Sequence, residues 1–241
     1  MTNTSAGTGP GSAGTPGLPD VSALVIGVLG GTGDQGRGLA RRLAMAGQKV
    51  IIGSRSAERA AAAAAAINAG LGATATAVSG AGNAECARQS DLVVVAVPWD
   101  GHRATVESLT GELAGKIVVD CVNPLGFDKQ GAFPLPVEEG SAAEQAAAIL
   151  PASRVVAAFH HVSAALLNDP QVASVDTDVL VLGDDREATD TVQAVAYRID
   201  RMRGVYAGRL RNAHQVEALT ANLISVNRRY KSHAGLRVTD V

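Results

Sequence analysis

The sequence is poor in cysteine, in aromatic residues and in net charge. Its 241 residues include two cysteines, 3% aromatic side chains and a formal net charge of −2. Cys86 and Cys121 cannot build a disulfide framework, and no Cys/His spacing typical of zinc is present, so we expect no metal. The near-neutral charge argues against nucleic acid or an anionic membrane as a partner. A core with so few aromatic rings must consist mainly of Val, Ile, Leu and Ala.

Long hydrophobic runs are also missing. Apolar runs such as residues 92–97 have the length of a strand, and none approaches the roughly 20 residues that span a bilayer. Residues 1–22 lack the charged and apolar segments of a signal peptide. We expect a flexible tail there, because so little apolar surface cannot offset the entropy of ordering. Together with the low cysteine content, this indicates a soluble, cytoplasmic protein.

Short apolar runs alternate with helical patterns from Leu24 onward. Strands are predicted at residues 24–29, 49–52, 73–78, 92–97, 116–120, 155–159, 179–182 and 205–206. Helices are predicted between them, with Gly47 closing the first, Ser56 capping the second and a last amphipathic helix over 212–230. This alternation predicts an α/β fold, namely a doubly wound, mainly parallel Rossmann sheet with a C-terminal helical extension.

The chain is expected to form two parts after the tail. Residues 23–162 should form the Rossmann domain, and residues 163–241 an extension packed on it, because no Pro/Gly-rich linker separates them. Residues 123–140 are rich in Gly, Pro and Phe, and we predict a surface loop there. Loops of this length often cover a site. In sheets of this kind, ligands bind beyond the carboxyl ends of the strands.

A glycine-rich loop, Gly31-Thr32-Gly33-Asp34-Gln35-Gly36, follows the first predicted strand and opens the first helix. GxGxxG alone is weak evidence, but this context is typical of a dinucleotide site. We expect Gly31 to permit the tight turn, Gly33 to let the backbone approach a pyrophosphate, and Gly36 to let helix and strand pack closely. The N-terminus of the helix would then face the anion with unpaired N–H groups. A glycine-rich turn without a ligand is the alternative.

The end of the second predicted strand indicates which dinucleotide is bound. Sites that prefer NAD usually place Asp or Glu there, whereas this chain has Ser54 and Arg55, with Arg59 one helical turn later. A hydroxyl and two guanidinium groups suit the 2′-phosphate of NADP, and Thr32 can add a hydroxyl. The alternative is that Arg55 and Arg59 are solvated surface charges. For Ser54 and Arg55 we favour binding of the 2′-phosphate over an exposed position without a ligand.

These motifs resemble those of the NADPH-dependent reductases of coenzyme F420, an 8-hydroxy-5-deazaflavin. The similarity extends from about Leu24 to the C-terminus, and the GGTGDQG and GSR elements are its most specific parts. The other matching segments are Val97-Pro98-Trp99, Phe159-His160-His161-Val162-Ser163-Ala164, Gly183-Asp184-Asp185, Ala207-Gly208-Arg209-Leu210 and Val216-Glu217-Ala218-Leu219-Thr220. Ser163 departs from the pattern, because some relatives carry Pro there, and the composition of residues 123–140 is not fixed by it.

The resemblance implies reversible hydride transfer between NADP(H) and coenzyme F420 in a homodimer, with the C-terminal extension covering the deazaflavin and contributing to the dimer. It implies contacts to pyrophosphate and ribose at Thr32, Gly33, Asp34 and Gln35, and to the 2′-phosphate at Ser54, Arg55 and Arg59. It places Val97, Pro98 and Val162 around the nicotinamide, and Trp99, His160, Ser163 and the turn of Ala207, Gly208 and Leu210 along the deazaflavin.

Several side chains near the predicted site have two interpretations. His160 could orient the deazaflavin or supply a proton, or it could bond the backbone at a strand end, and for His161 we favour the backbone bond. Trp99 is more typical of packing than of stacking on a ligand. Cys121 should act as a small hydrophobe rather than a nucleophile. Asp184-Asp185 should mark a helix N-terminus and not a metal site.

Other functions remain open at this stage. An NADP-dependent imine or ketone reductase would need a proton donor near the nicotinamide, for which Lys129 and Tyr206 are the candidates. A non-catalytic NADP sensor would need the glycine loop but no second pocket. A ferric reductase, suggested by distant similarity of fold, would need a haem-binding membrane segment that this sequence lacks.

Overall fold

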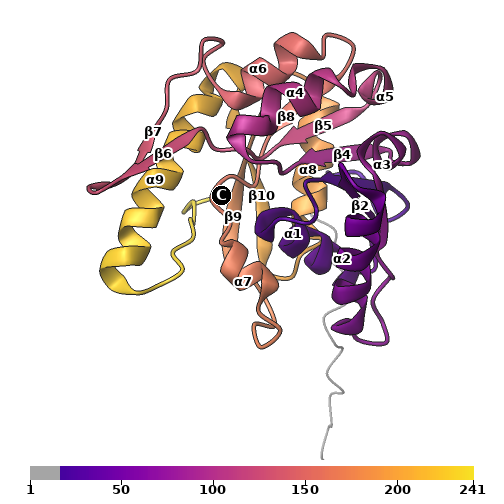
Figure 1. Cartoon of the computed structure of the whole chain (residues 1–241). Helices are drawn as coiled ribbons and strands as arrows, with labels where there is room; N and C mark the ends of the chain where they lie inside the picture. Colours follow the sequence, from indigo (N-terminus) through magenta and orange to yellow (C-terminus); the bar gives the residue numbers. More distant parts are fainter. Residues whose placement is uncertain (1–16) are drawn as a thin grey trace, which may run out of the picture.

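The computed structural model describes residues 17–241, and in them a single sheet of eight strands forms the centre of the molecule (Figure 1). The strand order is β10-β9-β8-β5-β4-β1-β2-β3, and all neighbouring strands are parallel except β8 and β9. Six strands thus have the order of a doubly wound dinucleotide-binding sheet, which confirms the predicted fold.

The elements follow one another in a regular alternation. The strands of the sheet are β1 (Val25–Leu29), β2 (Lys49–Ser54), β3 (Ser79–Gly82), β4 (Leu92–Val95), β5 (Ile117–Asp120), β8 (Arg154–Ala157), β9 (Thr177–Gly183) and β10 (Met202–Gly208). The helices are α1 (Asp34–Met45), α2 (Ala57–Ala69), α3 (Asn83–Gln89), η1 (Trp99–Gly101), α4 (His102–Glu107), α5 (Thr110–Leu113), α6 (Ala142–Ile149), α7 (Ala164–Asn168), α8 (Arg186–Tyr197), η2 (Leu210–Asn212) and α9 (Ala213–Tyr230). A separate hairpin consists of β6 (Leu125–Asp128) and β7 (Gly131–Pro134).

Two apolar layers cover the two faces of the sheet. Alternate residues of β4 belong to different layers, since Leu92 and Val94 pack with α1, α2 and α8, whereas Val93 and Val95 pack with α3 to α6. Figure 1 shows α4, α5 and α6 gathered beside one another, with α9 and the β6–β7 hairpin at one edge of the molecule. Because β1, β4, β5 and β8 are parallel neighbours, their carboxyl ends meet along the same edge of the sheet.

The predicted caps are confirmed, and the glycine loop forms a tight turn, with Gly33 N–H donating to the Gly30 carbonyl. Gly47 adopts a left-handed φ of 80° after α1, and Ser56 accepts a hydrogen bond from the Arg59 N–H at the start of α2. In the glycine loop the left-handed residue is Gly30, with φ 75°, and not Gly31. Gly31 is required for another reason, because a Cβ atom there would lie 2.5 Å from the Cβ of Ile52.

Two elements differ from the sequence-based prediction. The third strand is residues 79–82, and residues 73–78 precede it without strand structure. Within the stretch predicted as a loop, residues 123–140, the chain forms the β6–β7 hairpin, whose turn is held by Asp128 Oδ1 accepting from the N–H groups of Gln130 and Gly131. At the amino end, residues 1–16 of the predicted tail lie outside the described residues. Val21 is already buried, with 3% of its surface exposed.

The last part of the chain adds two strands to the sheet and then folds back against β9. β9 and β10 extend the same sheet, α9 runs along the hairpin, and residues 232–241, here called the C-terminal strap, lie against β9. Asp178 anchors this strap: its carboxylate binds Arg203, Arg237 and the Val238 N–H, and its own N–H donates to the Leu236 carbonyl. None of the helices in residues 17–241 is long and apolar enough to cross a membrane.

Candidate functional site

A cavity of about 880 Å³ lies over the glycine loop at the carboxyl ends of β1, β2 and β4. We call it the glycine-loop cavity. The sequence-predicted residues that line it are Thr32, Gly33, Asp34, Gln35, Ser54, Arg55, Arg59, Val97 and Pro98. These residues come from three strand ends and from the start of α1, which is the crevice where ligands bind in sheets of this topology.

The start of α1 is built to approach an anion closely. Gly33 is the N-cap residue and has no side chain to cap the helix, so the N–H groups of the first turn are left for a ligand. Gly31 and Gly36 do not line the cavity. Instead they allow close packing beneath it, because a Cβ at Gly36 would lie 2.7 Å from the Gly30 carbonyl oxygen. Asp34 forms an ion pair with Arg37 at 2.6 Å.

The far end of the glycine-loop cavity is basic. Arg55 and Arg59 are exposed, and neither forms an ion pair with any side chain in residues 17–241. Ser54 is buried at the end of β2, and its hydroxyl accepts from the Ser56 N–H at 3.3 Å. Unpaired guanidinium groups beside a hydroxyl are what a phosphate ester needs, since each can make charge-assisted hydrogen bonds.

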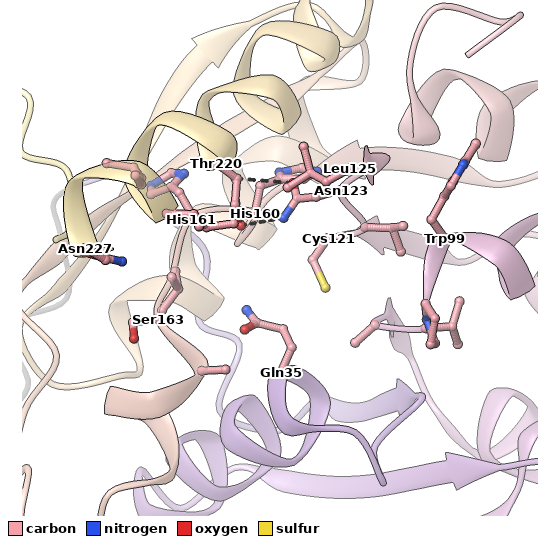
Figure 2. A pocket seen from close by; sticks show the side chains of 18 of the residues that line it. Gln35, Trp99, Cys121, Asn123, Leu125, His160, His161, Ser163, Thr220 and Asn227 are labelled. Atoms are coloured by element: carbon pink, nitrogen blue, oxygen red, sulfur yellow. Dashed lines mark hydrogen bonds between the residues drawn. The ribbon is translucent and has the colours of Figure 1, made fainter. Parts of the chain in front are cut away.

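A second cavity, of about 560 Å³, joins the first and extends toward α9. We call it the histidine cavity. The two cavities share the residues Gln35, Ala96, Val97, Pro98 and Asp100. Figure 2 shows Gln35 pointing into the histidine cavity from the start of α1, with Cys121 pointing toward it from the other side. The predicted residues Trp99, His160, Val162 and Ser163 line this cavity as well.

The wall that faces Gln35 is a strained turn after β8. Phe159 is fully buried and has φ 65°, which is rare for an aromatic residue. Hydrogen bonds from three other elements hold the turn. Gln35 Nε2 donates to the Phe159 carbonyl at 3.2 Å. Asn123 Nδ2 and Thr220 Oγ1 donate to the His160 carbonyl at 2.8 and 3.2 Å (Figure 2). The start of α1, the segment after β5 and α9 therefore all fix this turn.

The two neighbouring histidines have different environments. His161 Nε2 donates to the Asp178 carbonyl at 2.7 Å, which confirms the backbone bond that we favoured. The ring of His160 has no exposed surface, and neither of its nitrogens has a partner among the described residues. Burial lowers the pKa of His160 to about 4, so its ring is neutral at physiological pH. The backbone bond considered for His160 is absent; its ring faces Glu217, with Nε2 4.0 Å from Glu217 Oε1.

Behind His160 lies a group of buried charges. His102 Nε2 donates to Asp120 Oδ2 at 2.6 Å, and its Nδ1 donates to Gln145 Oε1 at 3.0 Å. Because Gln145 uses its NH₂ for Glu139, its oxygen faces His102, and both ring nitrogens of His102 carry protons. Burial opposes this charge, but Asp120 outweighs it and raises the pKa of His102. Burial also raises the pKa of Glu217 to about 7.

The remaining candidates divide into packing residues and residues outside the site. Trp99 stacks on His102 with ring centroids 5.6 Å apart, while also lining the histidine cavity. Cys121 donates to the Val95 carbonyl, and burial raises its pKa strongly, which confirms an unreactive thiol. Asp185 is the N-cap of α8, as predicted.

One predicted part of the site is placed elsewhere. Ala207, Gly208 and Leu210 line neither cavity. Leu210 is buried in the apolar layer beside α6 and α9, because β10 is the last strand at the far edge of the sheet. The predicted contacts of these three residues with the deazaflavin therefore find no support in the lining of either cavity.

Sequence reasoning missed several lining residues. Asn83 lines the glycine-loop cavity, and its buried Oδ1 has no partner within residues 17–241; it directly follows β3, the strand that the sequence predicted at the wrong position. Asn123, Thr220, Leu223, Ile224, Asn227 and Ala234 line the histidine cavity. Asn123 was detectable, since it lies three residues after the predicted end of β5. The residues of α9 and of the strap carry no such signal, because only tertiary packing brings them to the cavity.

Comparison with known proteins agrees with this geometry. The family model described as "NADP oxidoreductase coenzyme F420-dependent" matches residues 25–124. The chain is 40% identical over 223 residues to the F420-dependent NADP reductase of Methanothermobacter marburgensis, covering 90% of this chain and 99% of that protein. It is 41% identical over 224 residues to the F420-dependent NADP reductase of Methanocaldococcus jannaschii, again covering 90% and 99%. The chain belongs to the family of F420-dependent NADP reductases.

Solved structures and a more distant relative complete the comparison. The family fold also occurs in a protein from Arthrobacter sp. FB24 assigned as an F420-dependent NADP reductase, with TM-score 0.74, 29% identity and coverage of 90% of this chain and 100% of that one. Plasmodium falciparum pyrroline carboxylate reductase, solved with NADP bound, shares the fold alone at 12% identity and TM-score 0.55, covering 88% of this chain and 66% of that one. Rat metalloreductase STEAP3 is 34% identical over 200 residues, covering 83% of this chain and 37% of that protein.

Proposed function

We propose that this chain transfers a hydride reversibly between NADP(H) and the 8-hydroxy-5-deazaflavin coenzyme F420. The observation that carries the proposal is the pair of joined cavities, one over a dinucleotide loop and one beside it, that meet at Gln35, Val97 and Pro98. Two planar rings can meet there, since hydride transfer needs the reacting carbons at roughly 3–3.5 Å. The names of the relatives, F420-dependent NADP reductases, supply the chemical class of both ligands.

The glycine-loop cavity fits NADP(H) on its own geometry. The uncapped start of α1 suits the pyrophosphate, with Thr32, Gly33, Asp34 and Gln35 around it. Ser54, Arg55 and Arg59 suit the 2′-phosphate, because they offer a hydroxyl and two unpaired guanidinium groups in place of a carboxylate. Together these features favour NADP(H) over NAD(H).

The histidine cavity suits the deazaflavin. Val97 and Pro98 form the apolar wall where the two cavities meet, and the histidine cavity beyond is lined by Trp99, Asn123, Val162, Ser163 and Thr220. The two cofactors supply the hydride donor and acceptor, so the protein needs only to orient the rings and exclude water. The turn at Phe159, fixed from three elements, provides a rigid wall for that purpose.

The competing functions fit less well. Lys129 lies exposed at the tip of the hairpin, and Tyr206 lines a different cavity with Arg209, so neither can act as the proton donor of an imine or ketone reductase at the histidine cavity. A non-catalytic NADP sensor needs no second cavity, whereas this chain has one joined to the first.

A spectrophotometric assay of the purified protein tests the proposal. We expect NADPH to reduce the deazaflavin rapidly and NADH to reduce it slowly. Turnover of an imine in the absence of deazaflavin turnover would favour the competing enzyme class. Equal rates with NADPH and NADH would contradict the proposed binding of the 2′-phosphate by Ser54, Arg55 and Arg59. That result would not contradict hydride transfer to the deazaflavin.

We further propose a cytoplasmic homodimer formed through α9 and the β6–β7 hairpin. Large apolar side chains are exposed on both elements, with Phe127 at 69% and Tyr230 at 73%. β7 also packs against α9, so these elements form one continuous edge (Figure 1). Light scattering after gel filtration should give twice the chain mass. Tyr230→Ser should weaken the dimer, whereas Tyr197→Ser on α8 should not; a wild-type monomer contradicts the proposal.

A further inference from the structure

Glu217 and His160 form a buried pair directly behind the histidine cavity. Glu217 is 2% exposed, the ring of His160 has no exposed surface, and the atoms Glu217 Oε1 and His160 Nε2 lie 4.0 Å apart. Neither ring nitrogen of His160 bonds any of the described residues. A buried imidazole without partners costs free energy, so its place beside a carboxyl group calls for a functional reason.

The surroundings of Glu217 balance its two protonation states. The N–H groups of Ala142 and Ala143, at the start of α6, donate to its two oxygens at 3.0 and 3.2 Å and favour the carboxylate. Burial and the charge of Asp120 favour the acid, and the pKa of Glu217 rises to about 7. Since burial lowers the pKa of His160 to about 4, the pair near neutral pH holds one ionisable proton on Glu217 beside a neutral imidazole.

The charged groups around Glu217 do not hold it in one state. His102 from α4 and Asp120 from β5 face it as an ion pair whose charges offset each other. The hairpin strand β7 that packs on α9 carries no titratable side chain, and Arg211 of η2 and His214 of α9 are exposed. α6 contributes its N-terminus, with Glu144 bonded to Ser141. These charges therefore leave the pKa of Glu217 near neutrality.

The proposed reaction consumes one proton for each hydride that reaches the deazaflavin. Titratable residues in the described wall of the histidine cavity are Asp100, Cys121, His160 and His161. Burial raises the pKa of Cys121 far above neutrality, and His161 uses its Nε2 proton for the Asp178 carbonyl. Asp100 is exposed at the junction of the two cavities, where water competes for any proton. His160 is the buried wall residue with a proton source behind it.

We propose that Glu217 is a positioning residue for proton transfer, holding a proton at Oε1 that passes to His160 Nε2 while His160 Nδ1 releases its own proton at the wall of the histidine cavity. The O–H bond of Glu217 and the Nδ1–H bond of His160 break, the Nε2–H bond of His160 forms, and the proton from Nδ1 bonds to the deazaflavin ring that takes up the hydride. The released proton is the one that the reaction consumes, so this inference rests on the proposed function. Afterwards Glu217 is a carboxylate and His160 is neutral with its proton on Nε2, and hydride transfer in the other direction reverses each step.

The geometry requires a small closure of the pair. The present separation of 4.0 Å exceeds a hydrogen bond between a carboxyl oxygen and a ring nitrogen, so the two side chains must approach by about 1 Å before the proton passes. Thr220 lies one helical turn after Glu217 and bonds the His160 carbonyl. A movement of α9 on ligand binding would therefore carry both contacts to His160 together.

The first test compares Glu217→Gln with Glu144→Gln, a matched change at the same end of α6. In wild type we expect kcat for deazaflavin reduction by NADPH to fall with rising pH above about 7. Glu217→Gln should lower kcat on the order of 10²-fold, flatten this limb and leave the KM for NADPH unchanged. Glu144→Gln should keep the wild-type profile. A Glu217→Gln enzyme with the wild-type pH limb would overturn the proposal.

The second test needs no turnover and no altered Glu217. In wild-type protein without ligands, NMR of the His160 ring carbons, assigned with His160→Asn, should show a transition near pH 7 as Glu217 titrates. A His160 signal that is constant between pH 6 and pH 8 would overturn the proposal even if Glu217→Gln fails to fold. If wild type does not reduce the deazaflavin at all, the proposed function fails, and that result is separate from the behaviour of the His160 signal.

Discussion

Arg55 is the single residue on which the choice of dinucleotide most depends. It is exposed at the end of β2 and has no ion pair with other side chains in residues 17–241, so its charge is available to a ligand. Loss of a hydrogen bond to a charged group costs about 1.5–3 kcal/mol, and we expect Arg55→Ala to raise the KM for NADPH by a corresponding roughly 10- to 150-fold. The KM for NADH should barely change, which steady-state kinetics with both nucleotides would measure.

The matched control for Arg55→Ala is Arg186→Ala. Arg186 is 95% exposed on α8 and lines a different cavity, so its removal changes the net charge equally without touching the glycine-loop cavity. Both KM values should stay at the wild-type level. If Arg55→Ala raises the KM for NADPH and the KM for NADH to the same degree, Arg55 binds a part of the dinucleotide that both nucleotides share.

Single residues were predictable from sequence where local chemistry decides their role. The loop of Thr32 to Gln35 and the Ser54-Arg55 pair were found because glycines and basic residues at strand ends have few other uses. Glu217 and Thr220 were not assigned roles, since helical periodicity shows a face of α9 but not what covers it. The sequence predicted a tight turn at Gly31 but not its left-handed residue, which is Gly30, because either of the two adjacent glycines could adopt that conformation.

At the scale of elements, the C-terminal strap closes one side of the histidine cavity. Ala234 of the strap lines that cavity, and Asp178 holds the strap through Arg203, Arg237 and the Val238 N–H. Hydrogen bonding to Arg203 lowers the pKa of Asp178, so its contribution to stability is present above the unfolded value of about 3.9 and is lost as pH falls through the lower, folded pKa.

We therefore expect Asp178→Asn to loosen the strap at neutral pH. Hydrogen exchange at the amide of Val238 should become faster, and the KM for the deazaflavin should rise several-fold. The KM for NADPH should be unchanged, because no strap residue lines the glycine-loop cavity. Asp176→Asn is the control, since Asp176 is half exposed and its ion pairs with Arg201 and Arg237 should contribute little. Unchanged exchange in Asp178→Asn would mean that other contacts hold the strap.

Elements escaped prediction where packing demands small residues. β3 has the sequence Ser-Gly-Ala-Gly, which carries no strand signal, yet a Cβ at Gly80 would lie 2.4 Å from the backbone of Ala60 in α2. Close packing of α2 on the sheet thus selects glycine and hides the strand. The neighbouring residues 73–78 alternate like a strand but pair with no other strand. The β6–β7 hairpin was missed because its strands have only four residues each and contain Gly and Pro.

At the scale of the whole molecule, two buried groups make opposite contributions to the pH dependence of folding. The pKa of Glu217 is about 7 in the folded chain and lower when unfolded, so the folded state binds more protons between about pH 4.5 and 7 and loses stability as pH rises. The pKa of His160 is about 4 in the folded chain and near 6.5 when unfolded, so its contribution falls as pH drops below 6.5. Because the two effects have opposite signs, the pH dependence of the free energy of unfolding of wild type shows neither of them separately.

Substitution should reveal them separately. Relative to Glu217→Gln, the wild-type advantage in free energy of unfolding should shrink between pH 5 and pH 8, by on the order of 1–3 kcal/mol. Relative to His160→Asn it should change in the opposite sense, since that variant lacks the group that must stay neutral. Urea denaturation at both pH values measures these differences, and His102 and Asp120 are present in every variant and largely cancel. The free energy of unfolding of both variants could instead change with pH in the same way as that of wild type. In that case the carboxyl and the imidazole have the same protonation in the folded and unfolded chain, and the buried pair holds no exchangeable proton in this pH range.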